Sequence, residues 1–283
     1  MDGTRKHENR PSASMIEKGS ARTVPVLPWG GYGLGNEEEQ ALLMDVCLLA
    51  GQLMLISGAE THRVEDTMTR MAAAYTTSPS QSYVTPTAII FTIDEVDSTQ
   101  MVRISERTND LLKVVLVNNL SRKMSAGELT IEEAFVELTT IKNQTPTYSL
   151  RLKIGAAAIA SGCFLIMFNG IWSDFWPAVV AGGLGYTTYE ALHRLLQIKF
   201  VAECLAALVI GLTASFSISL GWGHQLDTII IGSVMPLVPG VLITNAIRDL
   251  IAGHLMSGVS KGVEAFLTAF GIGTGIALVL ALF

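Results

Sequence analysis

The densest group of polar side chains lies in the stretch GAETHRVEDTMTR, residues 58–70. His62 lies three and four positions before Glu65 and Asp66, so a helix would place the three on neighbouring faces. Such a set could bind a metal ion or act as an acid–base pair. However, the HExxH pattern is absent and a complete zinc site needs more ligands. We therefore favour surface ion pairs over a metal or any other cofactor. The expected pairs are Arg63 with Glu60 and Arg70 with Asp66.

A second group lies in SVMPLVPGVLITNAIRDLIAG, residues 233–253, which is otherwise apolar enough for a membrane helix. Pro236 and Pro239-Gly240 should break that helix, because proline removes a backbone hydrogen bond and clashes with the preceding turn. The freed backbone groups then need partners in the protein or in a water-filled cavity. The positive end of a helix that restarts at Gly240 suits a substrate carboxylate. A plain proline kink is the alternative, but three helix breakers in five residues favour a substrate path. Its next members would be Thr244 and Asn245.

Four carboxylates lie within or beside the apolar stretches, at Glu190, Glu203, Asp249 and Glu264. Burying a carboxylate in a membrane is costly, and residues of this kind often relay protons. We expect Glu203 and Glu264 to be solvated charges at the membrane surface. Glu190 lies deeper in its apolar stretch and is the expected proton-coupling residue, with Asp249 second. The hypothesis that follows is proton-coupled transport.

The chain that must position these groups divides into a charged part and an apolar part. Of its 283 residues 49% are hydrophobic and only 16% are charged, against about 25% charged in a typical soluble protein. Almost all of the charge precedes Lys153. We predict a disordered leader over residues 1–36, a cytoplasmic α+β domain over 37–150 and a membrane domain over 151–283. The net charge of −6 gives no sign of nucleic-acid binding.

Five apolar stretches approach the roughly 20 residues that a bilayer-spanning helix needs. The predicted fold is therefore an α-helical polytopic membrane protein with five spans, the fourth of them broken. The expected spans cover about 153–173, 175–196, 200–222, 226–248 and 262–283. Dense small residues in these stretches are expected to pack helices together rather than to line a pore.

Basic residues should orient these spans, because Lys and Arg are enriched in cytoplasmic connections. They occur in alternate connections between the spans. For a protein of the cell (inner) membrane, this places the amino terminus in the cytoplasm and the carboxyl terminus on the outer side. The basic residues concerned are Arg151, Lys153, Arg194, Lys199, Arg248 and Lys261. The tryptophans expected at the outer boundary are Trp172, Trp176 and Trp222.

The charged part is expected to form helices and one hairpin. Residues 37–75 should form two helices that meet near Ser57-Gly58, and strand-like runs at 85–94 and 99–107 flank an EVDS turn. Further helices are expected over 110–124 and 129–141. The expected capping boxes are Ser57 with Glu60 and Thr130 with Glu133.

The two groups described first also carry a family resemblance. SGAETHRVEDTMTRMA resembles the amino-terminal signature Gly-Ala-x-Thr-x-Arg-Val-Glu of the threonine/serine exporter (ThrE) family. MPLVPGVLITNAIRDLIAGHLMSG resembles its membrane signature, Pro-Gly followed by Thr-Asn-x-Ile-Arg-Asp. The resemblance runs from about Glu38 to the end of the chain. It implies a secondary transporter, not an enzyme, that exports L-threonine and L-serine and is driven by the proton gradient. Split relatives have also been associated with succinate export.

The resemblance further implies which residues to examine. In the α+β domain it indicates a regulatory or coupling motif of Gly58, Thr61, Arg63 and Glu65. In the membrane domain it indicates a substrate path or structural role for Pro239, Gly240, Thr244, Asn245, Arg248 and Asp249.

Fused members of the family carry about ten spans, so the five expected here resemble the larger subunit of the split form. This implies either a small membrane subunit that supplies further spans, or self-association. Two alternatives stay open: a dicarboxylate exporter subunit, and a membrane-anchored enzyme or sensor with its site around His62 and Glu65. An anchor needs no broken span, which favours the transporter.

Overall fold

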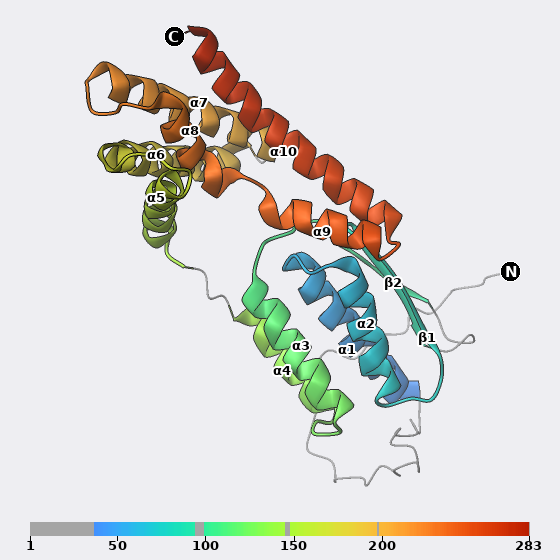
Figure 1. Cartoon of the computed structure of the whole chain (residues 1–283). Coiled ribbons are helices and arrows are strands. Elements are labelled where there is room, and N and C mark those ends of the chain that lie inside the picture. The colour runs from blue at the N-terminus through green and yellow to red at the C-terminus, as the bar shows by residue number, and fades with distance from the viewer. Residues whose placement is uncertain (1–36, 94–98, 145–147, 197, 283) are drawn as a thin grey trace, which may run out of the picture.

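The computed structural model describes residues 37–93, 99–144, 148–196 and 198–282, and most of these residues are helical. The predicted leader, residues 1–36, lies outside this range. The first elements build an amino-terminal unit of four helices and a three-stranded sheet (Figure 1). They are α1 (Glu37–Ile56), α2 (Thr61–Ala73), β1 (Ser80–Thr85), β2 (Ala88–Ile93), β3 (Gln100–Arg103), α3 (Leu111–Ser125) and α4 (Ile131–Asn143).

The sheet is antiparallel in the order β1-β2-β3. The predicted hairpin is confirmed, since β2 pairs with β3 and Ile89 lies opposite Val102. Its EVDS turn falls on residues 94–98, outside the described range. Strand β1 was not predicted, because its sequence SQSYVT is polar and lacks the apolar alternation that marks a half-buried strand.

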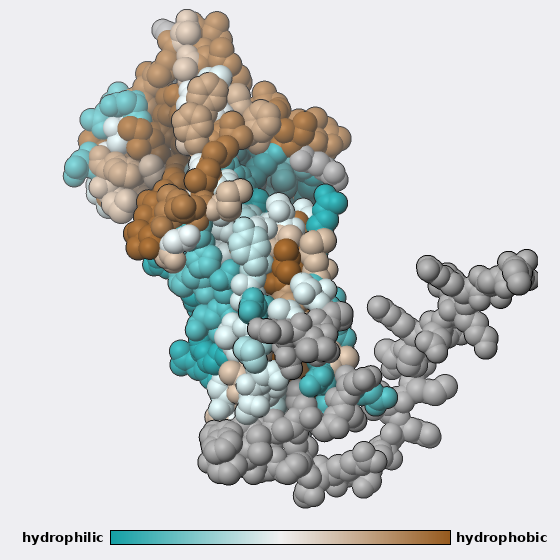
Figure 2. Space-filling model, turned by 90° about the vertical axis from the view of Figure 1, so that its right-hand side faces the viewer, coloured by the Kyte–Doolittle hydropathy of each residue, from teal (hydrophilic) through white to brown (hydrophobic). Residues whose placement is uncertain are grey.

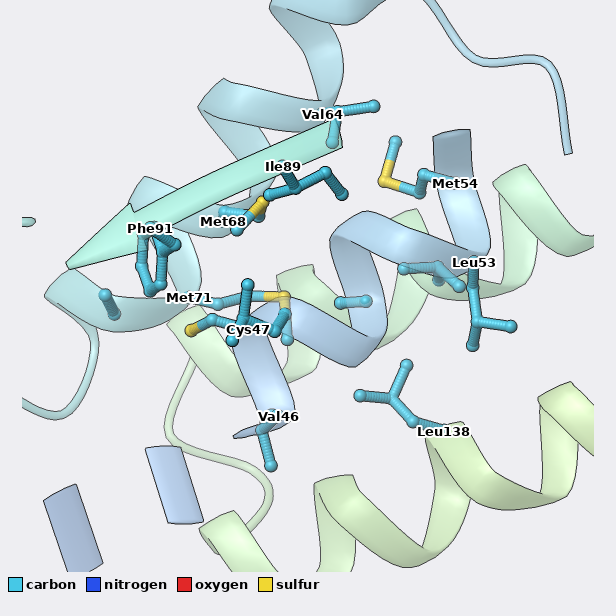
Figure 3. Close-up of a cluster of buried hydrophobic side chains, with 14 of the residues drawn as sticks. Val46, Cys47, Leu53, Met54, Val64, Met68, Met71, Ile89, Phe91 and Leu138 are labelled. Atoms are coloured by element: carbon cyan, nitrogen blue, oxygen red, sulfur yellow. The ribbon is translucent and has the colours of Figure 1, made fainter. Parts of the chain in front are cut away.

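Helix α1 lies at the centre of the amino-terminal core, where α2, α3, α4 and β2 contact it. A helix enclosed by protein is apolar on nearly all sides. This explains why the stretch 37–56 has a composition close to that of a membrane span. Figure 3 shows core side chains from several elements: Val46, Cys47, Leu53, Met54, Val64, Met68, Met71, Ile89, Phe91 and Leu138.

The two predicted capping boxes have different outcomes. The box at the start of α4 is confirmed, with Thr130 and Glu133 each bonding the other's backbone. The box of Ser57 with Glu60 is wrong. Helix α2 begins only at Thr61, and its N-cap residue Glu60 makes no side-chain cap.

The remaining helices form a helical unit. It consists of α5 (Leu150–Met167), the short helix η1 (Trp172–Asp174), α6 (Phe175–Leu196), α7 (Lys199–Ser219), α8 (Leu226–Val234), the short helix η2 (Met235–Leu237), α9 (Gly240–Ile251) and α10 (Leu255–Leu282). On the face that Figure 2 presents, hydrophobic side chains gather over this unit, while the amino-terminal unit is mostly hydrophilic or neutral. Helix α4 ends at Asn143 and α5 begins at Leu150; the proposed domain bounds at 150 and 151 stay a prediction.

Glycines occupy the closest contacts between the helices. A Cβ atom at Gly182 of α6 would collide with Ser161 of α5, and one at Gly275 of α10 would collide with the Cys204 carbonyl of α7. By contrast, a Cβ at Gly273 would meet nothing within 4 Å. The small residues at these contacts thus pack helices together, as expected for membrane helices.

The predicted break is confirmed. Helix α8 ends at Val234, η2 follows, and α9 restarts at Gly240 after a bend of 63°. Helix α9 therefore leaves the direction of α8 and lies across the amino-terminal unit (Figure 1). The stretch 226–248 is a strongly bent pair of short helices rather than a straight span.

Among the described residues, four helices are long and apolar enough to cross a membrane, namely α1, α5, α7 and α10. The number rises to five if the bent pair α8–α9 counts as one span. The predicted spans instead include 175–196, where α6 lies, and do not include α1. Helix α6 falls short in apolarity because Pro177, its Thr and Tyr residues and Glu190 lower its mean hydropathy. Helix α1 qualifies by composition although more than half of its apolar stretch is buried inside the molecule.

Helix α10 begins at Leu255 rather than at residue 262, the predicted start of the last span. Its 28 residues give a length of about 42 Å, which exceeds the roughly 30 Å hydrocarbon core of a bilayer. Helix α10 is therefore long enough for its first turns to lie outside the hydrocarbon core. These first turns approach the amino-terminal unit.

Candidate functional site

The two sequence motifs, far apart in the chain, meet in the structure. Asp249 at the end of α9 is completely buried, and its Oδ1 accepts a hydrogen bond of 3.0 Å from the backbone amide of Thr61. Its Oδ2 accepts from Thr61 Oγ1 at 2.9 Å and from Lys261 Nζ at 2.7 Å. Asp249 thus caps the amino terminus of α2, where a negative charge is favourable. Asp249 thus replaces the side-chain cap that the N-cap residue Glu60 does not provide.

A second contact joins the same two motifs one helical turn away. Asn245 Nδ2 donates to the Gly58 carbonyl at 2.8 Å. Gly58 follows α1 with a φ of +89°, and a Cβ there would lie 3.0 Å from Asn109 Oδ1. Both the positive φ and the close approach require glycine at this position. The motif residue Gly58 therefore shapes the turn that presents its carbonyl to α9.

Glu60 forms the third contact, through ion pairs with Arg63 and with Arg248 of α9. Its side chain is 7% exposed. Burial alone would raise the pKa of Glu60, but a backbone hydrogen bond and the guanidinium groups of Arg248 and Arg63 together hold it below its ordinary value. The carboxylate is therefore charged and serves as an anchor for α9.

Two histidines lie at the edge of these contacts. His62 Nδ1 is 3.8 Å from Asp249 Oδ1, and His254 Nδ1 is 3.7 Å from Glu65 Oε1. Glu65 also accepts a hydrogen bond of 2.8 Å from the Val84 amide in β1. His62 and Glu65 thus belong to the contact between the units, and no group of three potential metal ligands occurs within the described ranges. The predicted ion pairs of Arg63 with Glu60 and of Arg70 with Asp66 are confirmed.

A cavity of about 670 Å³ opens between the two units, beside the break that separates α8 from α9. Of the residues predicted to form a substrate path, Pro236, Pro239 and Asn245 line it. From the helical unit it also includes Tyr186, Tyr189, His193, Lys199, Glu203, Val241, Leu242, Lys261 and Glu264. From the amino-terminal unit it includes Gly58, Ala59, Ser105, Arg107, Thr108 and Asn109.

The charged groups around the cavity are unequally satisfied. Arg107 and Lys199 both form ion pairs with Glu264, and Lys261 is paired with Asp249. Glu203 is only 2% exposed, and its Oε2 has no hydrogen-bond partner among the residues that the structure describes. The prediction that Glu203 is a solvated surface charge is therefore wrong.

The remaining predicted residues lie outside the cavity lining. Glu190 forms an ion pair of 2.7 Å with Arg194, one turn along α6. Gly240 and Thr244 are exposed, with Thr244 Oγ1 donating to the Gly240 carbonyl at 2.8 Å. Arg248 contacts Glu60 instead of the cavity. The roles assigned to all of these residues stay predictions.

Sequence reasoning missed Glu203 as a site residue, although a signal was present. Ala206, Ala207 and Ile210 follow it at spacings of three, four and seven, so the four residues share one helical face. That face is small and apolar, which indicates close contact with neighbouring helices rather than solvent. A lone carboxylate on it is therefore expected to be buried.

Comparison with known proteins places these observations in a family. The family model described as "Putative threonine/serine exporter" (ThrE) matches residues 45–283. A "Probable succinate transporter subunit YjjP" from Klebsiella aerogenes is 25% identical over 87% of this chain and 96% of its own length. The protein of the same name from Escherichia coli is 23% identical over the same shares. A "Probable threonine/serine exporter" from Mycobacterium tuberculosis is 23% identical over 84% of this chain, which spans 46% of that relative. No solved structure matches the chain.

Proposed function

The chain belongs to the threonine/serine exporter family, and from this premise we propose that it is a subunit of a secondary transporter. Its cargo is a small carboxylate-bearing metabolite, L-threonine or L-serine, and its export is coupled to protons. The cavity beside the helix break carries this proposal. Its volume of about 670 Å³ is that of a small-molecule site, and the backbone interruption at Pro236 to Pro239 forms one of its walls.

The orientation proposed with this function places the amino-terminal unit in the cytoplasm and the carboxyl terminus outside. The end of α6 and the starts of α7 and α10, which carry the basic residues, face the amino-terminal unit around the cavity. The two connections without Lys or Arg meet elsewhere, where buried Asp174 accepts hydrogen bonds from the backbone amides of His224 and Gln225 at 2.9 Å. Trp172 and Trp222 in these connections and Trp176 at the start of α6 are exposed. This segregation supports the orientation that the positive-inside rule gives.

The proposed membrane spans include α6, although its composition alone is too polar. Its Ala178 and Ala181 pack within the helical core, and its Tyr186, Tyr189 and His193 line the cavity, so its polar residues are not all turned towards lipid. The proposal excludes α1 as a span, because α1 fills the core of the amino-terminal unit.

We propose a small membrane subunit as the partner. The two relatives named as transporter subunits are matched over 96% of their length, whereas this chain spans less than half of the Mycobacterium tuberculosis relative. A second polypeptide would supply the remaining spans. Self-association is the alternative route to a complete transporter.

A second candidate function is export of succinate or another dicarboxylate. The names of the Klebsiella aerogenes and Escherichia coli relatives favour it. Both functions require the same cavity, so the cargo distinguishes them.

The test is transport by proteoliposomes that contain the full chain together with the candidate small subunit. Radiolabelled threonine, serine and succinate are offered with and without a pH gradient. The Leu242→Trp variant should abolish flux by filling the cavity, whereas Ile247→Trp on the exposed face of α9 should retain it. Equal flux in both variants would exclude the cavity as the path. No flux of any of the three solutes would reject the proposed function.

A further inference from the structure

Glu203 is the least satisfied buried charge beside the cavity. It lies in the second turn of α7, lines the cavity and leaves Oε2 without a hydrogen-bond partner in the described part of the chain. Thr268 and the charge of Lys199 offset only part of the cost of burying this carboxylate, because burial removes its hydration. A buried carboxylate in a membrane helix is therefore a candidate binding group. A proton and a cationic ligand are the two species that would satisfy it.

The groups that face Glu203 come from three helices. Lys199 lies one turn before it on α7. Helix α6 presents Tyr189 and His193, and also Glu190, which is paired with Arg194. Helix α10 presents Thr268 and Glu264, and its Lys261 lines the same cavity. The rings of Tyr189 and His193 are stacked at 5.6 Å, and His193 Nδ1 has no hydrogen-bond partner among the described residues.

The charges around the cavity favour an ammonium group over a second carboxylate. Arg107 and Lys199 are both held by Glu264, and Lys261 is held by Asp249. Each of these lysine and arginine side chains therefore has a carboxylate partner, whereas Glu203 Oε2 has no cationic one. A dicarboxylate would have to displace an existing ion pair. An ammonium group could pair with the Glu203 carboxylate without displacing any existing ion pair.

The start of α9, which also lines the cavity, suits a carboxylate. Helix α9 has 12 residues, and its N-cap residue Pro239 makes no side-chain cap. The first amides of a helix have no partner within that helix, and they carry a partial positive charge. The Gly240 amide is bonded to the Val238 carbonyl at 2.8 Å, but Val241 and Leu242 of this first turn line the cavity. An anion can thus approach this end of α9.

We propose that Glu203 is the ammonium-binding residue for an α-amino-acid cargo and that it holds either this ammonium or a proton, never both. The cargo carboxylate lies at the amino-terminal end of α9. This inference rests on the proposed function and deepens it, because it names the group that recognises the cargo and couples it to the proton.

The exchange follows from competition for one carboxylate. When the cytoplasmic amino acid enters, the O–H bond of protonated Glu203 breaks and its proton passes to water, and the carboxylate pairs with the ammonium. When the amino acid leaves on the other side, the carboxylate takes a proton from water there. One proton therefore moves inwards for each amino acid that moves outwards. Succinate, which carries no ammonium, cannot displace the proton.

The first experiment measures proton release. The full chain with its small subunit, in nanodiscs and a weakly buffered solution with a pH indicator, receives L-threonine or succinate. We expect wild type to release protons on addition of threonine but not of succinate. Glu203→Gln should release none. Glu137→Gln, which removes a carboxylate from an exposed ion pair on α4, is the matched control and should behave as wild type.

The second experiment separates coupling from binding. In proteoliposomes, Glu203→Gln should keep threonine counterflow, because the amide oxygen still accepts a hydrogen bond from the ammonium. Its KM should rise roughly ten- to a hundredfold, since a charge-assisted hydrogen bond becomes a neutral one. Threonine flux driven by a pH gradient should be lost. Retained counterflow also shows that the variant is folded.

The outcomes separate this inference from the proposed function. Wild-type threonine transport together with normal proton release and pH-driven flux in Glu203→Gln overturns the assignment of Glu203 alone. Proton release by wild type on succinate addition overturns the preference for ammonium. Failure of wild type to carry any of the labelled solutes rejects the transporter itself.

Discussion

At the scale of single residues, Asp249 illustrates how a motif position can be read in two ways. The sequence favoured it as a proton carrier, second to Glu190. In the structure, both of its oxygens accept hydrogen bonds, from the Thr61 amide and hydroxyl and from Lys261. Three donors, one of them the Lys261 ammonium, thus hold this buried carboxylate in place. This geometry favours a structural role, as the cap of α2.

The Asp249–Lys261 pair gives a first prediction. Asp249→Asn should destabilise the chain by about 3–5 kcal/mol, because it leaves the buried ammonium of Lys261 without its counter-ion. The double variant Asp249→Asn with Lys261→Met should recover part of this loss. Thermal unfolding of the detergent-solubilised chain measures both. Asp66→Asn, at an exposed ion pair, is the control and should change stability by less than about 1 kcal/mol. Equal shifts for the two Asp→Asn variants would contradict the structural role.

Glu60 gives a second prediction, on pH. Its folded-state pKa lies below its ordinary value, so its contribution to stability is fully present above the unfolded pKa of about 4.3. The contribution is lost as pH falls through the lower, folded pKa. Wild type should therefore exceed Glu60→Gln in melting temperature at pH 7, and the gap should close under acid. A gap that is constant down to pH 3 would show that the carboxylate charge is not the cause.

At the scale of elements, the close contacts of α7 with α10 depend on glycine. A Cβ at Gly271 would lie 2.9 Å from the Phe200 carbonyl, and one at Gly275 would meet the Cys204 carbonyl. Backbone atoms cannot rotate away as a side chain can. In lipid, where apolar burial gives no net drive, such close approach is a main source of helix association.

The third prediction uses this contrast within one helix. Gly275→Ala should force α7 and α10 apart and lower the melting temperature, by the equivalent of roughly 1–3 kcal/mol of overpacking. Gly273→Ala, whose Cβ meets nothing within 4 Å, should leave it unchanged or raise it slightly. Thermal unfolding in detergent, with size-exclusion profiles, distinguishes the two. A larger loss from Gly273→Ala would refute the packing.

Features that depend on nearby residues could be predicted from the sequence. The β2–β3 hairpin, the Thr130–Glu133 box and the break after Pro236 each follow from a few adjacent side chains. The failures are long-range. The cap of α2 comes from Asp249, 188 residues away, and no local pattern announces it. Likewise, composition alone does not separate the enclosed helix α1 from a membrane span, because both are apolar on nearly all sides.

At the scale of the whole molecule, the cavity exists only because the amino-terminal unit closes it. Arg107 and Asn109 from this unit line it together with Lys199 and Glu264 from the helical unit. Access from the amino-terminal side therefore depends on how firmly the two units are held together. We expect the contact between Arg107 and Glu264 to open during transport.

The fourth prediction tests this movement. In a background without the native cysteines, Arg107→Cys and Glu264→Cys are joined by a short reducible thiosulfonate cross-linker. Cross-linking should stop threonine flux, and reduction should restore it, because the tether holds the mouth of the cavity closed. Each single-cysteine variant, treated with the same reagent, is the control. Full flux in the cross-linked protein would mean that cargo enters by another route.

The cap that Asp249 of α9 forms on α2 also affects how relatives of this chain could be recombined. A chimaera that joins the first half of one exporter to the second half of another inherits Thr61 and Gly58 from one parent and Asp249, Asn245 and Lys261 from the other. The chimaera should assemble only where the residues from the two parents can form these same hydrogen bonds and this ion pair. Compatibility of two halves could thus be judged from these five residues before any hybrid is made.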